Sequence, residues 1–252
     1  MESVLLAFSG GADSSFLLKV ASEVLPNDKL LAVTAKSETY PEEELRSARH
    51  FTRKFGIRHM VISTHELNNK IFVSNPANRC YFCKEELFSK LRDIAKKQKL
   101  NFVLDASNVT DKSDYRPGDK AKLEFKIRSP LQEAGFTKED IRNLSKEQGI
   151  PTWDKPSLAC LASRIPYTTK ITPVLLGRIN QAEVFLRKLG FKQVRLRHYN
   201  GLCRIEVTKK DIPSLISKSN QVVDKLKKLG YNYITIDLEG YRTGSMNEVI
   251  KK

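Results

Sequence analysis

Apolar and polar residues alternate along the first hundred residues in the manner of alternating strands and helices. Short apolar runs predict strands at 3–8, 30–35, 58–62 and 101–105, and apolar positions at helical spacing predict helices at 13–25, 41–55 and 83–98. This order predicts an α/β fold in which helices cover both faces of a parallel sheet. Ligands of such sheets bind beyond the carboxyl ends of the strands.

The pattern changes in the second half of the chain. Between about 106 and 170, turn-rich segments surround a helix predicted at 137–148, and long ordered loops of this kind usually carry function. Thereafter the predicted order is a helix at 173–189, strands at 192–198 and 203–208, a helix at 211–229 and a strand at 231–237. The sequence therefore predicts a large domain at 1–170 and a small α+β domain at 171–252.

Composition predicts a cytoplasmic location and leaves open the reason for the basic charge. The 252 residues are 40% hydrophobic, which is enough for a core, and they contain neither a long apolar run nor a basic leader. Lys and Arg number 44 against 29 Asp and Glu, a net charge of +15. Such an excess is typical of a polyanionic partner, an anionic substrate or a lysine-rich proteome, and charge alone does not choose among them.

A glycine-rich loop, Ser9–Ser15, joins the first predicted strand to the first predicted helix. Gly10 and Gly11 let the backbone approach a ligand closely, and the free N–H groups at a helix start suit phosphate oxygens. The loop lacks the lysine of a Walker A motif and the spacing of a dinucleotide fingerprint. A plain strand-to-helix turn, with Asp13 as an N-terminal charge, is the alternative. Further hydroxyl donors come from Ser9, Ser14 and Ser15.

Four cysteines are present, and two of them form a Cys-x-x-Cys pair. Cys80 and Cys83 lie at a predicted helix start, where the helix dipole favours the thiolate. A zinc site would need four ligands, and neither the other cysteines nor the four histidines show paired spacing with these two. A thioredoxin-like redox pair also remains open. Taken alone, Cys160 among apolar neighbours is typical of a small buried residue.

The dipeptide Asn200-Gly201 predicts a hairpin with a type I′ turn. Its register places four charged side chains on one face and Cys203, opposite His198, on the other, where we expect Cys203 to pack rather than bind a ligand. Arg197 lies opposite Arg204, and because like charges repel, the charged face is either solvated or holds an anion. The four charged residues are Arg195, Arg197, Arg204 and Glu206.

The loop "SGGADSS" resembles the pyrophosphate loop of the PP-loop ATP pyrophosphatases. Nearly the whole chain resembles the LarE family of ATP-dependent sulfur transferases, which act in the biosynthesis of the nickel-pincer nucleotide cofactor. Beyond the loop, this match rests on "DYRPG" at 114–118, "ACLASRIPY" at 159–167 and "GYRTGSMNE" at 240–248. The resemblance implies that ATP adenylates each carboxylate of pyridinium-3,5-biscarboxylic acid mononucleotide in turn, and that sulfur then displaces AMP.

The resemblance also implies a sulfur source. Cys160 matches the cysteine that donates its own sulfur in some members of the family, and those members lack the Cys-x-x-Cys pair. Cys80 and Cys83 make this chain similar to members in which three cysteines hold a [4Fe–4S] cluster. Three thiolates leave one iron open for sulfide, which would make sulfur transfer catalytic rather than sacrificial.

Site residues follow from the resemblance in three groups. ATP and Mg²⁺ are expected on Ser9, Gly10, Gly11, Asp13, Ser14 and Ser15, with Ala35, Lys36, Ser107 and Asn108 beside the adenosine. The substrate phosphate is expected on Arg195 and Arg197 near Arg164, with Glu183 and Glu206 orienting the substrate or the arginines. Catalytic roles are expected for Cys160, Asp13 and Glu206.

Two other functions compete with this prediction. Related PP-loop enzymes that 2-thiolate tRNA also use three cysteines and a cluster, and a charge of +15 suits RNA, although the additional zinc-binding cysteine pairs of many such enzymes are missing here. A non-catalytic nucleotide-binding or cluster-carrying protein is the second. The resemblance also implies a homo-oligomer supplied by a sulfide donor.

Overall fold

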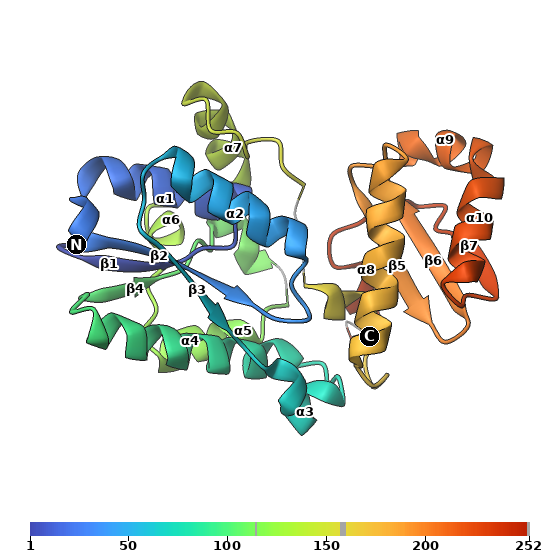
Figure 1. Ribbon diagram of the computed structural model, residues 1–252, viewed down its shortest axis with the longest axis horizontal. Helices are drawn as coiled ribbons and strands as arrows, with labels where there is room; N and C mark the ends of the chain where they lie inside the picture. Colours follow the sequence, from blue (N-terminus) through green and yellow to red (C-terminus); the bar gives the residue numbers. More distant parts are fainter. Residues whose placement is uncertain (114, 157–159, 251–252) are drawn as a thin grey trace. The chain divides into compact units, whose positions relative to one another are not determined.

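The computed structural model describes residues 1–113, 115–156 and 160–250, and the chain separates into two compact units (Figure 1). The first unit comprises Met1–Phe72 and Asn78–Leu158, and the second comprises Val73–Ala77 and Ala159–Lys252. The described part of 159–170 thus groups with the second unit, although the sequence placed it in the first domain. The functional division at 170 stays a prediction. Asp114 of "DYRPG" and Ala159 of "ACLASRIPY" lie outside the described residues.

The first unit contains the predicted parallel sheet, in the order β3-β2-β1-β4. Its strands are β1 (Val4–Ala7), β2 (Leu30–Lys36), β3 (His59–Ser63) and β4 (Phe102–Leu104). The chain passes from β1 outward to β3 on one side and then returns to β4 on the other side of β1. The strand order therefore reverses between β1 and β4, and this switch point is where an open α/β sheet binds its ligand.

Helices cover both faces of this sheet (Figure 1). Leu6 and Ala32 pack with α1 and α2 on one face, whereas Leu5 and Val33 pack with α4 on the other, as the two-residue period of a strand requires. The helices are α1 (Ala12–Val24), α2 (Glu42–Lys54), α3 (Lys70–Val73), α4 (Arg79–Lys97), α5 (Gly118–Glu124), α6 (Pro130–Glu133) and α7 (Lys138–Glu147). The predicted α/β architecture is confirmed.

The second unit follows the predicted order, with one difference. Its elements are α8 (Pro173–Lys188), β5 (Val194–Tyr199), β6 (Leu202–Val207), α9 (Ile212–Ser217), α10 (Ser219–Lys228) and β7 (Tyr233–Ile236). The single helix predicted at 211–229 is wrong, because the chain leaves the helical conformation at Lys218. There the Lys218 ammonium donates to the carbonyl of Leu189, and serines on both sides favour helix ends over helix interiors.

Two features of the fold bear on the predicted loops and on membranes. The helix predicted at 137–148 is confirmed as α7, which Thr137 and Asp140 begin with a capping box. The neighbouring α5 and α6 are too short to leave a periodic pattern in the sequence. Within the described residues, no helix has the length and apolar character needed to cross a membrane.

Candidate active site

The loop between β1 and α1 has the backbone geometry of an anion site. Gly10 has φ +66°, and a Cβ there would lie 3.3 Å from the Cβ of Ala48 on α2, so this position requires glycine. Gly11 precedes α1, and in the described chain no side chain caps the helix start by a hydrogen bond. The first N–H groups of α1 therefore remain for an anionic ligand.

Three buried polar atoms at the same end of the sheet lack a hydrogen-bond partner among the described residues. They are Asp13 Oδ1, Ser15 Oγ and Asn108 Nδ2. Asp13 and Ser15 lie in the first turn of α1, and Asn108 follows β4. Buried polar groups are normally paired, so unpaired ones on both sides of the switch point fit a polar ligand and a cation held there.

The electrostatics of Asp13 are mixed. Burial raises the pKa of its carboxyl and Asp111 adds to the rise, whereas Lys138, Arg142 and Arg116 oppose it. These three cations come from the segment that follows β4, and the sequence predictions assigned none of them. The only signal was Arg116 within "DYRPG", because the other two become relevant only once α7 packs beside α1.

The residues predicted to flank adenosine lie at the ends of β2 and β4. Ala35 and Lys36 are the last two residues of β2, and the Lys36 ammonium is 3.4 Å from a carboxylate oxygen of Glu42. The Ser107 hydroxyl donates to Asp105 at 2.8 Å and accepts from Lys122 at 3.1 Å. This placement is compatible with an adenosine site, and the roles of these residues stay predictions.

Cys80 and Cys83 lie within the first two turns of α4, which begins four residues earlier than predicted. Residues three apart share a helix face, so both thiols lie on one side of α4. Cys80 is exposed and Cys83 is partly buried, and the Cys83 thiol donates to Glu66 Oε1 at 3.5 Å. Both thiols lie near the start of a helix, as the sequence predicted.

The other two cysteines belong to the second unit and differ in exposure. Cys160 is exposed, so the interpretation as a small buried residue is wrong. Cys203 is buried, and burial raises the pKa of its thiol to about 12, which confirms its predicted packing role. Among the described residues no three Cys, His, Asp or Glu side chains form a metal site. Cys80 and Cys83 lie in one unit and Cys160 in the other.

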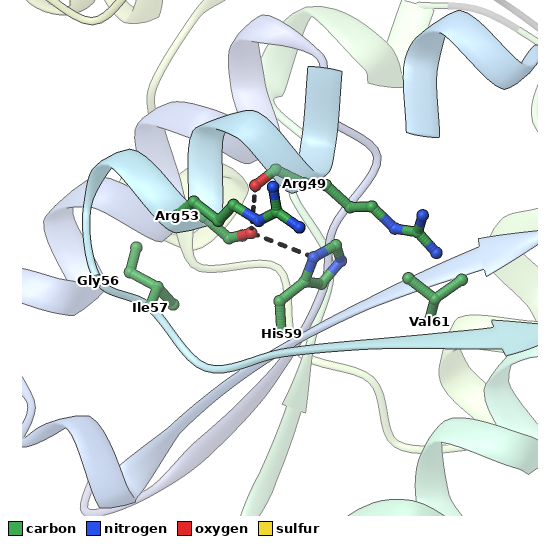
Figure 2. A pocket seen from close by; sticks show the side chains of 7 residues that line it. Arg49, Arg53, Gly56, Ile57, His59 and Val61 are labelled. Carbon is green, nitrogen blue, oxygen red and sulfur yellow. Dashed lines mark hydrogen bonds between the residues drawn. The ribbon is translucent and has the colours of Figure 1, made fainter. Parts of the chain in front are cut away.

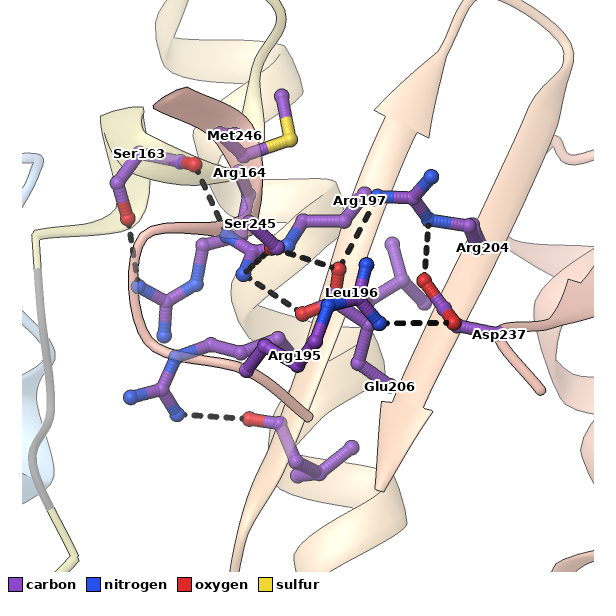
Figure 3. A network of polar contacts seen from close by, with 12 residues as sticks. Ser163, Arg164, Arg195, Leu196, Arg197, Arg204, Glu206, Asp237, Ser245 and Met246 are labelled. Carbon is purple, nitrogen blue, oxygen red and sulfur yellow. Dashed lines mark hydrogen bonds and ion pairs between the residues drawn. The ribbon is translucent and has the colours of Figure 1, made fainter. Parts of the chain in front are cut away.

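The hairpin has the register that the turn predicted, with Arg197 opposite Arg204 and Arg195 opposite Glu206. The solvated alternative is wrong for most of this face, because Arg195, Arg197 and Glu206 are 2%, 5% and 0% exposed. Arg197 donates to Glu206 at 2.7 Å and to the Ser245 hydroxyl at 2.9 Å (Figure 3). The charged face is therefore an internal network.

Arg164 and Glu183 form a second buried pair beside it. The guanidinium donates to both carboxylate oxygens, at 2.8 and 3.0 Å, and each residue is 1% exposed. Burial by itself raises the pKa of Glu183, but Arg164 and Arg195 outweigh burial and the pKa is lowered. Glu183 also accepts the backbone N–H of Leu196, which ties the pair to β5. Glu183 therefore orients Arg164.

Arg195 completes a cluster with an excess of positive charge. Burial lowers the pKa of its guanidinium to about 10, and the nearby positive charge of Arg164 is the largest electrostatic contribution to this shift. The guanidinium also lies over the ring of Tyr241, 5.1 Å from the ring centroid. We call Arg164, Arg195, Arg197, Glu183 and Glu206 the arginine cluster. Its three guanidiniums face two carboxylates, so a bound anion would offset buried positive charge. The arginines suit a phosphate, which they bind through paired N–H groups.

A separate pocket of about 500 Å³ lies at the outer edge of the sheet (Figure 2). Arg49 and Arg53 flank it, and His59 is the first residue of β3, in register with Ala32 of β2. Both ring nitrogens of His59 are hydrogen bonded, to Thr34 at 2.8 Å and Thr52 at 3.1 Å. None of the predicted site residues lines this pocket.

Comparisons with known proteins agree with this geometry. Residues 1–109, which contain β1 to β4, match the family model described as NAD synthase. The chain is 41% identical to the uncharacterized protein slr1717 of Synechocystis sp., in an alignment that covers the whole chain and 94% of that protein. It is 37% identical to the pyridinium-3,5-bisthiocarboxylic acid mononucleotide synthase of Lactiplantibacillus plantarum, in an alignment that covers the whole chain and 91% of that protein. It is 31% identical to the uncharacterized protein MJ0830 of Methanocaldococcus jannaschii, in an alignment that covers 81% of the chain and 77% of that protein.

Proposed function

The chain belongs to the LarE family, that of pyridinium-3,5-bisthiocarboxylic acid mononucleotide synthase, and from this premise we propose that it is an ATP-dependent sulfur transferase. Its substrate is pyridinium-3,5-biscarboxylic acid mononucleotide, and its product carries thiocarboxylates. The observation that carries the proposal beyond ATP binding is the surplus of buried guanidiniums in the arginine cluster. That surplus matches the phosphate of a mononucleotide.

The first half-reaction activates the carboxylate. A carboxylate oxygen attacks the α-phosphorus of ATP, the bond to the β-phosphate oxygen breaks, and pyrophosphate leaves. Gly10, Gly11 and the free N–H groups of α1 bind the pyrophosphate, together with the hydroxyls of Ser9, Ser14 and Ser15. Asp13 supplies an oxygen for Mg²⁺, which neutralises phosphate charge when it is bound. The unpartnered Oδ1 of Asp13 fits this role.

The second half-reaction brings in sulfur. A sulfur nucleophile attacks the carbonyl carbon of the acyl adenylate, the bond to AMP breaks, and AMP leaves with its electron pair. We assign that sulfur to an external sulfide rather than to the side chain of Cys160, and the exposed Cys160 to the ligands of the group that carries the sulfide. A second round on the other carboxylate completes the product.

Three cysteines suit a [4Fe–4S] cluster. Cys80 and Cys160 are exposed and Cys83 is partly buried, whereas Cys203 is buried with a raised pKa. Cys80, Cys83 and Cys160 would hold the cluster, and a cluster with three protein ligands would supply a site for sulfide. A separate sulfide donor would then restore the sulfur after each transfer, so that Cys160 is not consumed.

Glu183 and Glu206 act as positioning residues in this proposal. The carboxylate of Glu206 accepts hydrogen bonds from Arg197 at 2.7 Å and from Arg204 at 3.1 Å, and the residue is 0% exposed. This carboxylate therefore acts through the arginines rather than on the reacting atoms. In this proposal Glu206 has that positioning role in place of the catalytic role predicted from the sequence. A homo-oligomer and a cytoplasmic location stay predictions.

The experiment for the function follows pyrophosphate release from ATP and Mg²⁺ in the anaerobically prepared protein. Release should require the biscarboxylic acid mononucleotide, and an Arg197→Met variant should need far more of it, because the guanidinium that contacts phosphate is gone. Release that responds to tRNA instead would overturn the proposed substrate. Absence of substrate-dependent release would overturn the enzyme.

The experiment for the cluster measures iron and acid-labile sulfide in the wild type and in single Cys→Ala variants. We expect about four irons per chain in the wild type. Cys203→Ala should retain them, and the variants of Cys80, Cys83 and Cys160 should lose them. Retention by any of these three variants would contradict its assignment as a ligand.

A further inference from the structure

Two side chains donate hydrogen bonds to successive carbonyl groups of the glycine loop. The Tyr40 hydroxyl donates to the carbonyl oxygen of Ser9 at 2.7 Å. The Lys155 ammonium donates to the carbonyl oxygen of Gly10 at 2.9 Å. Lys155 begins the "KPSLAC" stretch that also contains Cys160, and neither it nor Tyr40 has a role in the function proposed above.

The Lys155 ammonium is fixed at one point. Its three N–H groups meet three acceptors, the carbonyl of Gly10, the Ser47 hydroxyl at 3.1 Å and Glu44 Oε2 at 2.8 Å. Its side chain is 16% exposed and that of Glu44 is 10% exposed. An ammonium removed from water in this way needs a close counter-charge, and Glu44 provides it.

One face of α2 forms the wall behind the loop. Glu44, Ser47 and Ala48 are three and four residues apart, so they lie side by side on the helix. Ala48 contacts the position where Gly10 would carry a Cβ, and the other two hold Lys155. The loop therefore rests on α2 through Gly10 and is tied to it through Lys155.

This arrangement sets the direction of the loop's N–H groups. In a trans peptide the C=O and N–H bonds point in opposite directions. Because Lys155 holds the Gly10 carbonyl toward α2, the N–H of Gly11 points away from α2. Tyr40 acts in the same way on the peptide that joins Ser9 to Gly10. Among the described residues the Gly11 N–H makes one long contact, 3.5 Å to Ser9 Oγ, so it remains available to a ligand.

We propose that Lys155 is a positioning residue for pyrophosphate, which fixes the Gly10–Gly11 peptide with its N–H group turned toward the leaving group of ATP. The inference rests on the proposed function, in which this loop binds pyrophosphate. Its ammonium also polarises the peptide, which strengthens the N–H as a donor. Lys155 does not touch the reacting atoms in this account, because its three donors are already occupied.

The test measures binding of inorganic pyrophosphate with Mg²⁺, and of AMP, by calorimetry on the full chain. Lys155→Met keeps the length of the side chain and removes its charge and donors. We expect it to weaken pyrophosphate binding at least about tenfold, the effect of losing a charged hydrogen bond that orients the binding peptide. AMP affinity should stay near the wild-type value, because AMP lacks the leaving group. A purely structural role would lower both affinities together.

Lys218→Met is the matched control. Lys218 also donates its ammonium to a backbone carbonyl, that of Leu189 at 2.7 Å, but it lies in the second unit. It should leave both affinities unchanged. Lys155→Arg, which keeps the charge but moves the donors, should bind pyrophosphate with intermediate affinity and gives the answer if Lys155→Met does not fold.

The outcomes separate the two proposals. If the wild type binds pyrophosphate and both Lys155 variants bind it with the affinity of the wild type, the inference is overturned and the proposed function stands. If Lys155→Arg loses AMP and pyrophosphate affinity in the same proportion, the positioning role is also overturned. If the wild type does not bind pyrophosphate, the proposed function fails and the inference fails with it.

Discussion

Replacement of Gly10 by alanine tests whether the loop conformation is required for binding. Gly10 has φ +66°, a conformation that costs a residue with a Cβ about 1–2 kcal/mol. The new Cβ would also lie 3.3 Å from the Cβ and 3.4 Å from the Cα of Ala48, which is closer than ordinary packing. Since Ala48 is buried in a helix that backs the loop, the loop rather than α2 should move.

Replacement of a second glycine separates the loss of stability in Gly10→Ala into a conformational part and a part due to the forced contact. Gly56 has φ +62°, but a Cβ there would meet nothing within 4 Å. Gly56→Ala should therefore cost only the conformational part, about 1–2 kcal/mol. Gly10→Ala should cost this amount and up to about 1 kcal/mol more for the forced contact.

The assay combines denaturant unfolding with binding of Mg²⁺-pyrophosphate. Gly10→Ala should lower the free energy of unfolding slightly more than Gly56→Ala, and it alone should lose pyrophosphate affinity, by at least about tenfold. The reasoning is refuted if Gly10→Ala binds pyrophosphate as the wild type does. It is also refuted if Gly56→Ala loses the same affinity, because strain far from the loop would then explain the loss.

Three further predictions concern stability. Glu183→Gln should lower the free energy of unfolding by about 3–5 kcal/mol, because it leaves Arg164 buried without its counter-charge; Glu133→Gln, at an exposed ion pair, should change the urea midpoint far less. Burial lowers the pKa of His59 from its ordinary 6.5 to about 4, so the unfolded chain binds the proton first and stability should fall as the pH drops through this range. His59→Gln should remove that part of the slope in unfolding midpoints measured at several pH values, and an unchanged slope would contradict the assignment. Cys203→Ala should destabilise the chain by about 1 kcal/mol through a small cavity, and a stability equal to that of the wild type would argue against tight packing there.

The features that the sequence predicted well depend on local chemistry. The hairpin register follows from Asn200-Gly201 and the two-residue period of strands, and the structure has that register. The break at Lys218 was missed because it also involves a contact with Leu189, which lies 29 residues away in the chain. Periodicity alone does not reveal such contacts.

The site was predicted in its residue types but not in its pairings. The arginines and glutamates were named, yet the bidentate contact between Arg164 and Glu183 joins two elements whose packing no local pattern specifies. Lys155 was missed for the same reason, since it contacts Gly10 across 145 residues of sequence. The choice between a solvated face and a buried network likewise required tertiary structure, because both have the same alternation of residues.

Sulfur transfer itself is tested by analysing the product formed from pyridinium-3,5-biscarboxylic acid mononucleotide, ATP, Mg²⁺ and excess sulfide under anaerobic conditions. Mass spectrometry would follow the replacement of carboxylate oxygen by sulfur and the amount of product per chain. We expect more moles of thiocarboxylate product than of protein chain, with Cys160 intact. Absence of the thiolated product would contradict the function, and product that stops at one sulfur per chain as Cys160 is lost would contradict catalytic sulfur transfer.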